Sequence, residues 1–266
     1  MYEAQRDAAI AAALAGGAVL MAHFRRLDLS AIDEKTKNDF VSIADKESEA
    51  AVREVLDFRF PQYGFVGEEG GASGDEERRW IVDPLDGTLN FIQGFPHWCV
   101  SIALWDQEGA VTGCVFDPLR DDLFIATRGK GAFWIEGVST HKHERPMRVS
   151  QQQTLDAAFL AVGFAFQLGP RFPEFMALFT KSFPRAKGMR RAGSAALDLA
   201  HTAAGIFDGY FELGLKKWDI AAGALLLQEA GGRLSDWHGG DAWWESGDLL
   251  CGTPGVHADL VELAGN

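Results

Sequence analysis

Trp80-Ile81-Val82-Asp83-Pro84-Leu85-Asp86-Gly87-Thr88 is the most informative stretch of this sequence. Its apolar start predicts the end of a strand, and two carboxylates then fall on a tight turn. Pro84 fixes its own φ and favours an extended Asp83, while Gly87 allows a sharp turn and the close approach of a ligand. Two hard oxygen ligands beside backbone N–H groups suit a divalent cation that carries a phosphate.

The same turn has a purely structural interpretation. Asp-Pro and Asp-Gly are ordinary turn dipeptides, because an Asp side chain readily accepts hydrogen bonds from nearby backbone N–H groups. Taken alone, a turn with two Asp residues is structural more often than catalytic. The catalytic interpretation therefore depends on acidic and glycine-rich motifs elsewhere in the chain.

Composition limits the classes of function. The chain has 266 residues with 38 acidic and 25 basic side chains, so its formal net charge is −13. This excess argues against a general nucleic-acid surface, which needs a basic stripe. Its three cysteines are far apart and lack zinc-site spacing, which favours a reducing compartment. Residues 8–22 are too short and too rich in alanine to span a bilayer, and the first residues do not resemble a signal peptide. We expect a cytoplasmic protein without membrane contact.

The hydrophobic pattern predicts two halves that pack as one compact unit with a cleft between them. Residues 1–146 combine N-terminal helices with an antiparallel meander. The elements predicted there are helices at 2–24 and 44–57, loops at 35–39 and 64–74, of which the second is Gly-rich and a candidate mobile segment, and strands at 80–82, 100–105, 110–116, 122–127 and 132–135. Residues 147–266 alternate strands and helices, which predicts a second sheet with helices against it. The elements predicted there are strands at 158–162, 187–190 and 206–212 and helices at 172–182, 194–204 and 218–230.

Four acidic segments are candidates to converge on one site. They are Gly67-Glu68-Glu69-Gly70, the turn at 83–88, Trp218-Asp219 at a helix start, and the loop from Lys35 to Asp45. Each segment also has a structural interpretation. Asp219 and Asp45 could simply cap helices, and Glu68 and Glu69 could simply be exposed surface residues. Carboxylates without His or Cys select Mg²⁺ or Mn²⁺ over Zn²⁺. Such sites catalyse phosphoryl chemistry.

These residues identify a family resemblance. The chain resembles the inositol monophosphatase family, within the larger group of Mg²⁺-dependent, lithium-sensitive phosphatases. Residues 80–91 match its first signature, and its second is matched by Trp218-Asp219-Ile220-Ala221-Ala222-Gly223 with Glu229-Ala230-Gly231-Gly232. The resemblance covers roughly residues 5–262, and residues 190–214 look most similar to bacterial members. It implies an α/β fold, the layered αβαβα sandwich of the inositol monophosphatase and fructose-1,6-bisphosphatase type, and a homodimer.

The resemblance also implies a metal site with two or three Mg²⁺ ions, which Mn²⁺ can replace and at which Li⁺ inhibits. Glu68, Asp83 and the carbonyl of Leu85 would hold the ion that activates water. Asp83, Asp86 and Asp219 would hold a second ion near the leaving-group oxygen. Glu68 would also touch a third, weaker ion through water.

Further roles follow from the same resemblance. Glu68 counts among the catalytic residues, and Thr88, with Asp45 behind it, would orient and help to deprotonate the attacking water. Lys35 matches a loop lysine that approaches the site. The implied substrate contacts are Asp86, Gly87, Thr88, Gly193, Ser194, Ala195, Glu212 and Asp219. Glu68 precedes Asp83 by 15 residues, a shorter spacing than in animal members, so substrate preference is not carried over from those enzymes.

The implied reaction is hydrolysis of a phosphate monoester by direct attack of a metal-activated water, without a phosphoenzyme. Inositol 1-phosphate is the first candidate substrate, and histidinol phosphate, fructose 1,6-bisphosphate and 3′-phosphoadenosine 5′-phosphate are alternatives on the same scaffold. A regulatory protein that acts through the transcription machinery is the alternative from another class. The histidines are expected in surface or capping roles. Core positions are expected, rather than an aromatic pocket, for Trp98, Trp105, Trp134, Trp243 and Trp244.

Overall fold

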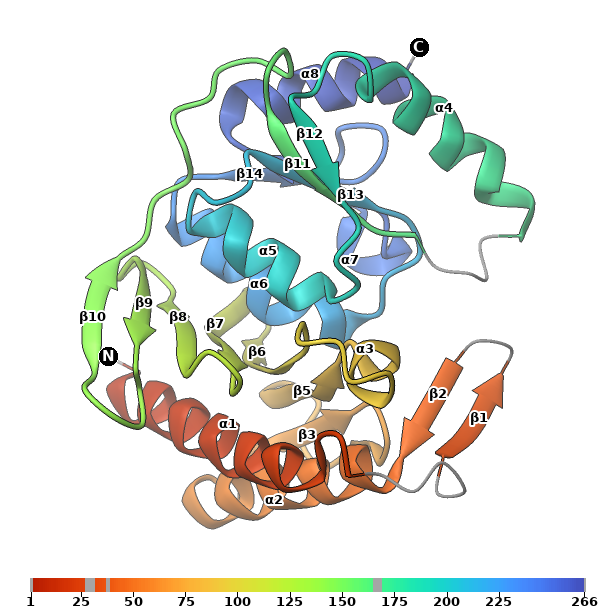
Figure 1. The fold of residues 1–266 in the computed structure, drawn as a ribbon. Helices are drawn as coiled ribbons and strands as arrows, with labels where there is room; N and C mark the ends of the chain where they lie inside the picture. Colours follow the sequence, from red (N-terminus) through yellow and green to blue (C-terminus); the bar gives the residue numbers. More distant parts are fainter. Residues whose placement is uncertain (1, 27–31, 37–38, 165–168, 266) are drawn as a thin grey trace.

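The computed structural model describes residues 2–26, 32–36, 39–164 and 169–265, and at 32–36 and 39–41 it describes the backbone alone. The elements form five layers (Figure 1). Two helices, a large sheet, two further helices, a small sheet and two last helices follow one another. This arrangement confirms the layered α/β sandwich that the sequence predicted.

The large sheet has eight strands in the order β10-β9-β8-β7-β6-β5-β3-β4. Neighbours are antiparallel except β3 and β5, which run parallel. The strands are β3 (Gly64–Gly67), β4 (Gly71–Ser73), β5 (Arg79–Asp86), β6 (Cys99–Asp106), β7 (Gly109–Asp117), β8 (Asp122–Thr127), β9 (Ala132–Glu136) and β10 (His143–Pro146). The predicted meander is confirmed, because β6 to β9 each pair with the next strand in the chain.

Two helices, α1 (Glu3–His23) and α2 (Ile43–Arg59), cover the outer face of the large sheet. They approach closely because small residues line the contact face of α1. A Cβ on Gly16 would lie 2.7 Å from Cγ2 of Val52. Between these helices in the chain, β1 (Ile32–Thr36) and β2 (Asp39–Ser42) form an antiparallel hairpin.

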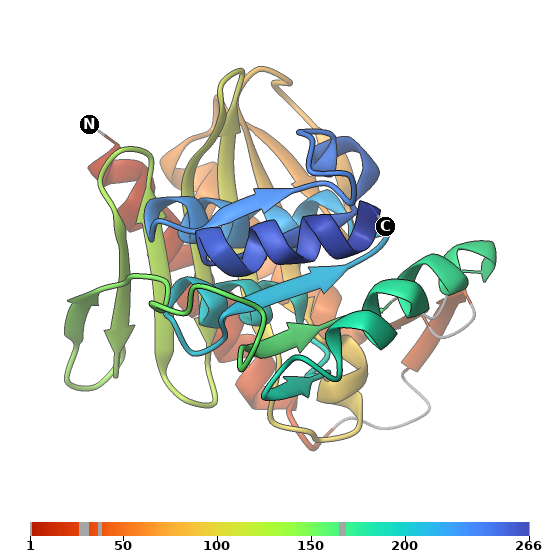
Figure 2. The ribbon, with the colours of Figure 1, turned by 90° about the horizontal axis from the view of Figure 1, so that it is seen from above.

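The small sheet has five strands in the order β12-β11-β13-β15-β14. β11 runs parallel to β12 and β13, and β15 runs antiparallel to β13 and β14. These strands are β11 (Phe159–Val162), β12 (Gly188–Arg190), β13 (Gly209–Glu212), β14 (Arg233–Ser235) and β15 (Leu249–Gly252). Figure 2 shows α8 (Pro254–Gly265) lying across this sheet, with α4 (Phe172–Ser182) beside it. A short helix, α7 (Trp243–Ser246), precedes β15.

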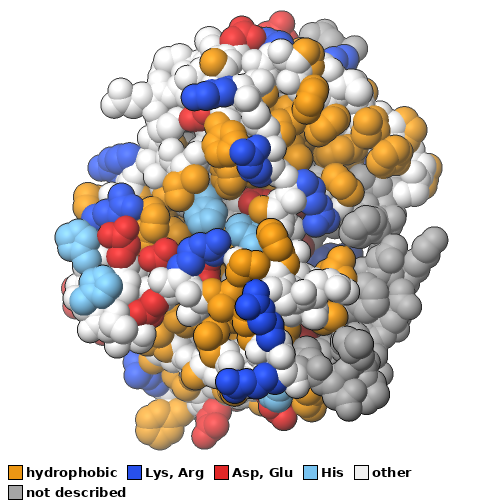
Figure 3. Space-filling model, in the orientation of Figure 1, with side chains coloured by type: hydrophobic (Ala, Val, Ile, Leu, Met, Phe, Trp, Pro, Cys, Tyr) orange, Lys and Arg blue, Asp and Glu red, His pale blue; other side chains and the backbone are white. Residues whose placement is uncertain are grey.

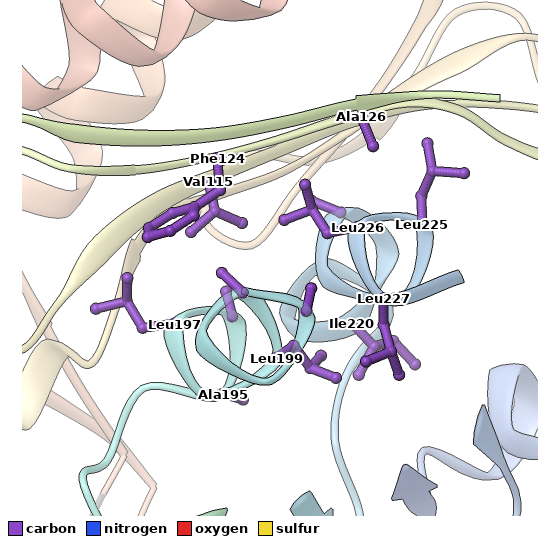
Figure 4. Packing of buried hydrophobic residues seen from close by; sticks show 14 of the residues in the cluster. Val115, Phe124, Ala126, Ala195, Leu197, Leu199, Ile220, Leu225, Leu226 and Leu227 are labelled. Carbon is purple, nitrogen blue, oxygen red and sulfur yellow. The ribbon is translucent and has the colours of Figure 1, made fainter. Parts of the chain in front are cut away.

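The middle layer consists of α5 (Ala195–Ala203) and α6 (Lys217–Glu229). On α6, residues 220–227 are all buried, as expected for a helix with a sheet on either side. Figure 4 shows Val115, Phe124 and Ala126 of the large sheet opposite these helices, where Leu226 packs against them. The same cluster includes residues of the small sheet, so this layer joins the two halves.

Two segments differ from the sequence prediction. The loop predicted at 64–74 is wrong, because β3 and β4 form a hairpin there whose partner β5 follows later in the chain. The loop predicted at 35–39 is interrupted by β1 and β2. Short strands rich in glycine or charge have no apolar alternation to reveal them. The sequence pattern also did not predict β10, β14 and β15, and it missed α7 and α8. Within the described residues, no helix is long and apolar enough to cross a membrane.

The close approach of α6 to β7 generates a stability prediction. A Cβ on Gly113 would lie 2.7 Å from the carbonyl oxygen and 2.9 Å from the Cα of Ala222. Because backbone atoms must then shift, Gly113→Ala should destabilise the fold by about 1–3 kcal/mol. Gly265→Ala is the control, because its Cβ would meet no atom within 4 Å. The urea concentration at the midpoint of unfolding measures the stability of each variant. Equal midpoints for the two variants would contradict the packing described.

Candidate active site

The predicted metal turn lies at the end of β5. β5 pairs with β6 through Asp83 and Ser101 and again through Asp86 and Cys99, with a shift of register between the two pairs. The extra residue is a β-bulge, a device that re-aims side chains. Asp83 is 2% exposed, and its Oδ1 accepts the N–H of Leu85 at 2.9 Å. Both carboxylates are therefore held in one short, buried segment.

Gly87 connects this bulge to α3 (Thr88–Ile92). Its φ is +92°, a left-handed conformation that side chains disfavour. A Cβ there would also lie 3.0 Å from the carbonyl oxygen of His97. Both observations confirm that this turn requires glycine, and the first residue after it is Thr88.

Thr88 and Asp45 are in contact, as the sequence interpretation expected. The Thr88 hydroxyl lies 3.2 Å from Oδ1 of Asp45 and 3.0 Å from the Leu85 carbonyl oxygen, so it can donate to either. Asp45 is 1% exposed, and its Oδ2 accepts the N–H and the hydroxyl of Ser42. Burial raises the pKa of Asp45, although these hydrogen bonds oppose the shift. Asp45 therefore completes a capping box at the start of α2 and faces Thr88 as well.

Glu68 comes from the turn between β3 and β4. The parallel pairing of β3 with β5 ends at Gly67 opposite Val82, which brings Glu68 level with Asp83. The Glu68 N–H donates to the Val82 carbonyl at 3.2 Å. Burial, followed by the charge of Glu68, raises the pKa of Asp83 well above its ordinary value. The two carboxylates are thus close enough to repel each other.

Asp86 is held from the second half of the chain. Its Oδ2 accepts the hydroxyl of Ser194 at 2.6 Å and the N–H of Ala196 at 2.7 Å. Ser194 is 1% exposed and is the N-cap of α5. Ser194 belongs to the turn that the family resemblance assigned to substrate contacts, and in this structure its hydroxyl contacts a carboxylate of the metal motif.

Asp219 stands in the first turn of α6. Its Oδ2 accepts the N–H of Lys216 at 2.7 Å, so its hydrogen bond matches the structural capping role. Burial, followed by the charge of Asp86, raises the pKa of Asp219 well above its ordinary value. The side chain also lines a cavity, where it is partly accessible. Asp219 therefore caps α6 and is also a member of the acidic cluster.

The carboxylates form an electrostatic cluster. The pKa values of Asp83, Asp86 and Asp219 are all raised, first by burial, and those of Asp83 and Asp219 also by neighbouring carboxylates. Within the described residues, no three His, Cys, Asp or Glu side chains stand in an arrangement that could hold a metal ion as they are placed here. Buried carboxylates that repel one another are a donor set of hard oxygens, which fits a hard divalent cation.

A cavity of about 130 Å³ opens beside this cluster. Figure 1 shows α3 and the starts of α5 and α6 on the same side of the molecule. The lining residues come from both halves, and they are Asp86, Gly163, Arg191, Gly193, Ser194, Ala195, Asp198, Glu212, Leu215 and Asp219. The structure therefore brings together most of the substrate contacts predicted from the sequence.

Glu212 is fixed on one wall of the cavity. The buried Tyr210 hydroxyl donates to Oε2 of Glu212. A Cβ on Gly163 would lie 1.7 Å from the same oxygen, so only glycine leaves room for this carboxylate. Burial raises the pKa of Glu212 to about 7.

Three polar side chains near the cavity were missed from the sequence. Arg191 lines the cavity, and Asp198 lines it from α5. His97 is 7% exposed, and its Nε2 lies 3.7 Å from Oδ1 of Asp198. Burial raises the pKa of Asp198 to about 6. The only signal in the sequence was the position of Arg191 and Asp198 around the Gly193-Ser194-Ala195 turn.

Three other expectations concern the histidines, Lys35 and the tryptophans. The surface or capping role expected for the histidines is wrong for His97, which is 7% exposed. His201 is partly buried, and burial and the nearby charge of His97 lower its pKa to about 3. The side chain of Lys35 lies outside the described residues. The core position expected for the tryptophans is confirmed for Trp98, which packs against Phe91. The other tryptophans of that prediction are only partly buried, and Trp105 stacks on Trp244 at 3.7 Å.

Comparison with known proteins identifies the family of this chain. The model of the inositol monophosphatase family matches residues 1–265, and the chain belongs to that family. Nus factor SuhB of Xylella fastidiosa is 41% identical over 233 residues, which cover 88% of this chain and 82% of that protein. These findings confirm the resemblance to bacterial members.

Solved structures give the same result. The crystal structure of extragenic suppressor protein suhB from Bartonella henselae has a TM-score of 0.88 and 34% identity, and the match covers 97% of each chain. The inositol monophosphatase from Anabaena (Nostoc) sp. PCC 7120 has a TM-score of 0.82 and 35% identity over 97% of this chain and 94% of that one. The fold is thus that of inositol monophosphatases.

The raised pKa of Asp86 generates a prediction about stability and pH. A carboxyl whose pKa is raised on folding stabilises the protein below its unfolded pKa of about 4, and this stability is lost as the pH rises through the folded pKa. In EDTA at pH 8, Asp86→Asn should therefore unfold at higher urea than the wild type, and the gap should narrow towards pH 4. Mg²⁺ should stabilise the wild type more than the variant.

Asp236→Asn is the matched control. Although burial opposes the shift, backbone N–H groups of Gly240, His238 and Ala242 lower the pKa of Asp236. Its carboxylate is stabilising, so the Asn variant should unfold at lower urea at pH 8. If both Asn variants lose stability in EDTA, the acidic cluster is not electrostatically strained.

Proposed function

We propose that this protein is a Mg²⁺-dependent phosphate monoester hydrolase whose substrate is inositol 1-phosphate. One observation carries the proposal. Carboxylates from separate segments converge at the mouth of one small polar cavity, and the Thr88–Asp45 pair stands at the same turn. Membership of the inositol monophosphatase family supports a phosphatase.

The cation would be held by the residues that the family resemblance implies. Glu68, Asp83 and the Leu85 carbonyl are assigned to one ion, and Asp83 with Asp86 and Asp219 to a second. When bound, Mg²⁺ or Mn²⁺ would lower the pKa of a water molecule and neutralise charge on the phosphoryl group, and Li⁺ would inhibit by replacement. Without a cation these carboxylates repel one another, which supports their role as ligands.

Thr88 and Asp45 would manage the proton of the attacking water. The Thr88 hydroxyl can donate to Asp45 and still accept a hydrogen bond from water through its lone pairs. Asp45, whose pKa burial raises, is then a stronger proton acceptor than an exposed carboxylate. The pair thereby orients the water for in-line attack on phosphorus.

The cavity supports a small hydroxyl-bearing substrate. Glu212 presents a carboxylate that accepts from hydroxyl groups, and Gly163 and Gly193 leave space beside it. Backbone N–H groups of Gly87 and Thr88 would bind the phosphate. Arg191 adds a positively charged side chain to the cavity lining. Substrates with a second anionic group, such as fructose 1,6-bisphosphate or 3′-phosphoadenosine 5′-phosphate, therefore stay alternatives, as does histidinol phosphate.

A binding role in transcription is the second candidate function. It is favoured by the identity of 41% to a protein named Nus factor SuhB. The net charge of −13 disfavours direct contact with RNA, so a protein partner fits better. The presence of Glu68, Asp83, Asp86 and Asp219 in one acidic cluster, of which Asp86 and Asp219 line the cavity, favours the hydrolase.

The assembly proposed with this function is a cytoplasmic homodimer. On the face shown in Figure 3, hydrophobic side chains gather around α4, and Phe172 and Phe183 at its ends are 50% and 59% exposed. Light scattering tests the dimer, which should have twice the mass of 29.0 kDa.

A substrate panel tests the reaction. Phosphate release from inositol 1-phosphate, histidinol phosphate, fructose 1,6-bisphosphate and 3′-phosphoadenosine 5′-phosphate is measured with and without Mg²⁺, with Asp86→Asn as the blank. We expect Mg²⁺-dependent turnover, highest with inositol 1-phosphate. Absence of turnover with Mg²⁺ bound would contradict the hydrolase. An Asp86→Asn variant that still rescues a deletion strain would favour the binding role.

Thr88 provides a separate test of the proton path. Thr88→Ala removes the hydroxyl that links water to Asp45, so kcat should fall by about 10²–10⁴ while the substrate KM changes little. Thr88→Ser is the matched variant, because it keeps the hydroxyl and should stay within about tenfold of wild type. Similar losses in both variants would show that packing of the methyl group, and not the hydroxyl, matters.

A further inference from the structure

The inner face of α2 carries three buried polar side chains that reach different parts of the site. Asp45 contacts Thr88, and the hydroxyl of Ser48 donates to the Pro84 carbonyl at 3.0 Å. Glu49, one turn beyond Asp45, is 6% exposed. Neither the sequence motifs nor the mechanism above uses Glu49, although a buried carboxylate is costly unless it has partners.

Glu49 holds the turn between β3 and β4. Its Oε2 accepts the N–H of Glu69 at 2.9 Å, a charge-assisted hydrogen bond that is stronger than a neutral one. Glu69 is the residue next to Glu68. The Glu49 carboxylate therefore acts on the backbone of the turn that carries a proposed metal ligand.

The turn is shaped to receive this carboxylate. A Cβ on Gly67 would lie 2.2 Å from Oε2 of Glu49, and a Cβ on Gly70 would lie 2.6 Å from Oε1. Neither glycine has a positive φ, so room for Glu49, and not backbone conformation, explains them. The two glycines flank Glu68 and Glu69, and together they form a socket for the carboxylate.

Glu68 lies just beyond the paired part of β3. The β3–β5 ladder ends at Gly67, and beyond it the Glu68 N–H donates to Val82. The next residues, Gly70 to Ser73, are exposed. Glu49 thus fixes the turn on its inner side, where core packing no longer reaches.

We propose that Glu49 is a positioning residue that sets the place of Glu68 and thereby the affinity of the site for its divalent cation. The proposal rests on the proposed function only in that Glu68 is a metal ligand. Glu49 would contact neither cation nor substrate. It would act through the N–H of Glu69, as residues behind a metal ligand commonly do.

Glu49→Gln is the direct test. Glutamine keeps one acceptor oxygen but loses the charge and directs an NH₂ group into the socket. We expect the dissociation constant of Mn²⁺, measured by electron paramagnetic resonance without substrate, to rise by about tenfold. The Mg²⁺ concentration for half-maximal activity should rise in parallel, while kcat at saturating Mg²⁺ stays within about threefold. Hydrogen exchange of the amides at 68–70 should accelerate.

Glu229→Gln is the matched control. Glu229 clamps the turn between β8 and β9 in the same way, because its two oxygens accept the N–H groups of Gly129 and Gly131 at 2.7 and 2.8 Å. It lies ten residues beyond Asp219 on α6, roughly 15 Å along the helix. We expect Glu229→Gln and Glu49→Gln both to lower the melting temperature. Glu229→Gln should leave the Mn²⁺ affinity at the wild-type value.

A second variant, Gly70→Ala, crowds the same carboxylate without altering its charge and should also weaken Mn²⁺ binding. Wild-type Mn²⁺ affinity in Glu49→Gln, or an equal loss in Glu229→Gln, would overturn the proposal. The two hypotheses fail separately. A wild type that binds Mn²⁺ but hydrolyses no substrate refutes the enzyme alone, whereas an active wild type with an unchanged Glu49→Gln refutes the positioning role alone. A wild type that binds no divalent cation refutes both.

Discussion

The structure depends on burying several carboxylates side by side at the junction of its layers. Such groups repel one another, and burial raises their pKa values further. The carboxylates nonetheless accept hydrogen bonds that hold them in place. The Leu85 N–H donates to Asp83, and the Ala196 N–H donates to Asp86. Backbone and capping donors thus hold in place a strained set of charges that a divalent cation would relieve.

The layered fold explains how distant segments reach this point. β5 brings Asp83 and Asp86, and residues in the first turns of α5 and α6 line the same cavity as Asp86. The close approach of Gly113 to Ala222 sets the depth of α6 against the large sheet. α2 then contacts the motif from the outer side through Ser48 and Asp45.

The sequence predicted the parts of the site that local chemistry encodes. The turn from Asp83 to Thr88, the meander and the helix that begins before Asp219 were all legible, because glycine, proline and apolar alternation mark them. Contacts between distant segments could not be predicted from the sequence. The β3–β4 hairpin depends on β5, and the burial of His97 depends on α5, so neither leaves a periodic signal in its own stretch of sequence. The roles of single ligands came from the family resemblance and stay predictions.

The most direct measurement is anomalous diffraction from crystals of the wild type grown with Mn²⁺. We expect one peak within bonding distance of Asp83, Asp86 and Asp219, and a second beside Asp83, Glu68 and the Leu85 carbonyl. The first peak should disappear in Asp86→Asn. Mn²⁺ bound elsewhere, or no peak among these carboxylates at saturating concentration, would contradict the proposed metal site.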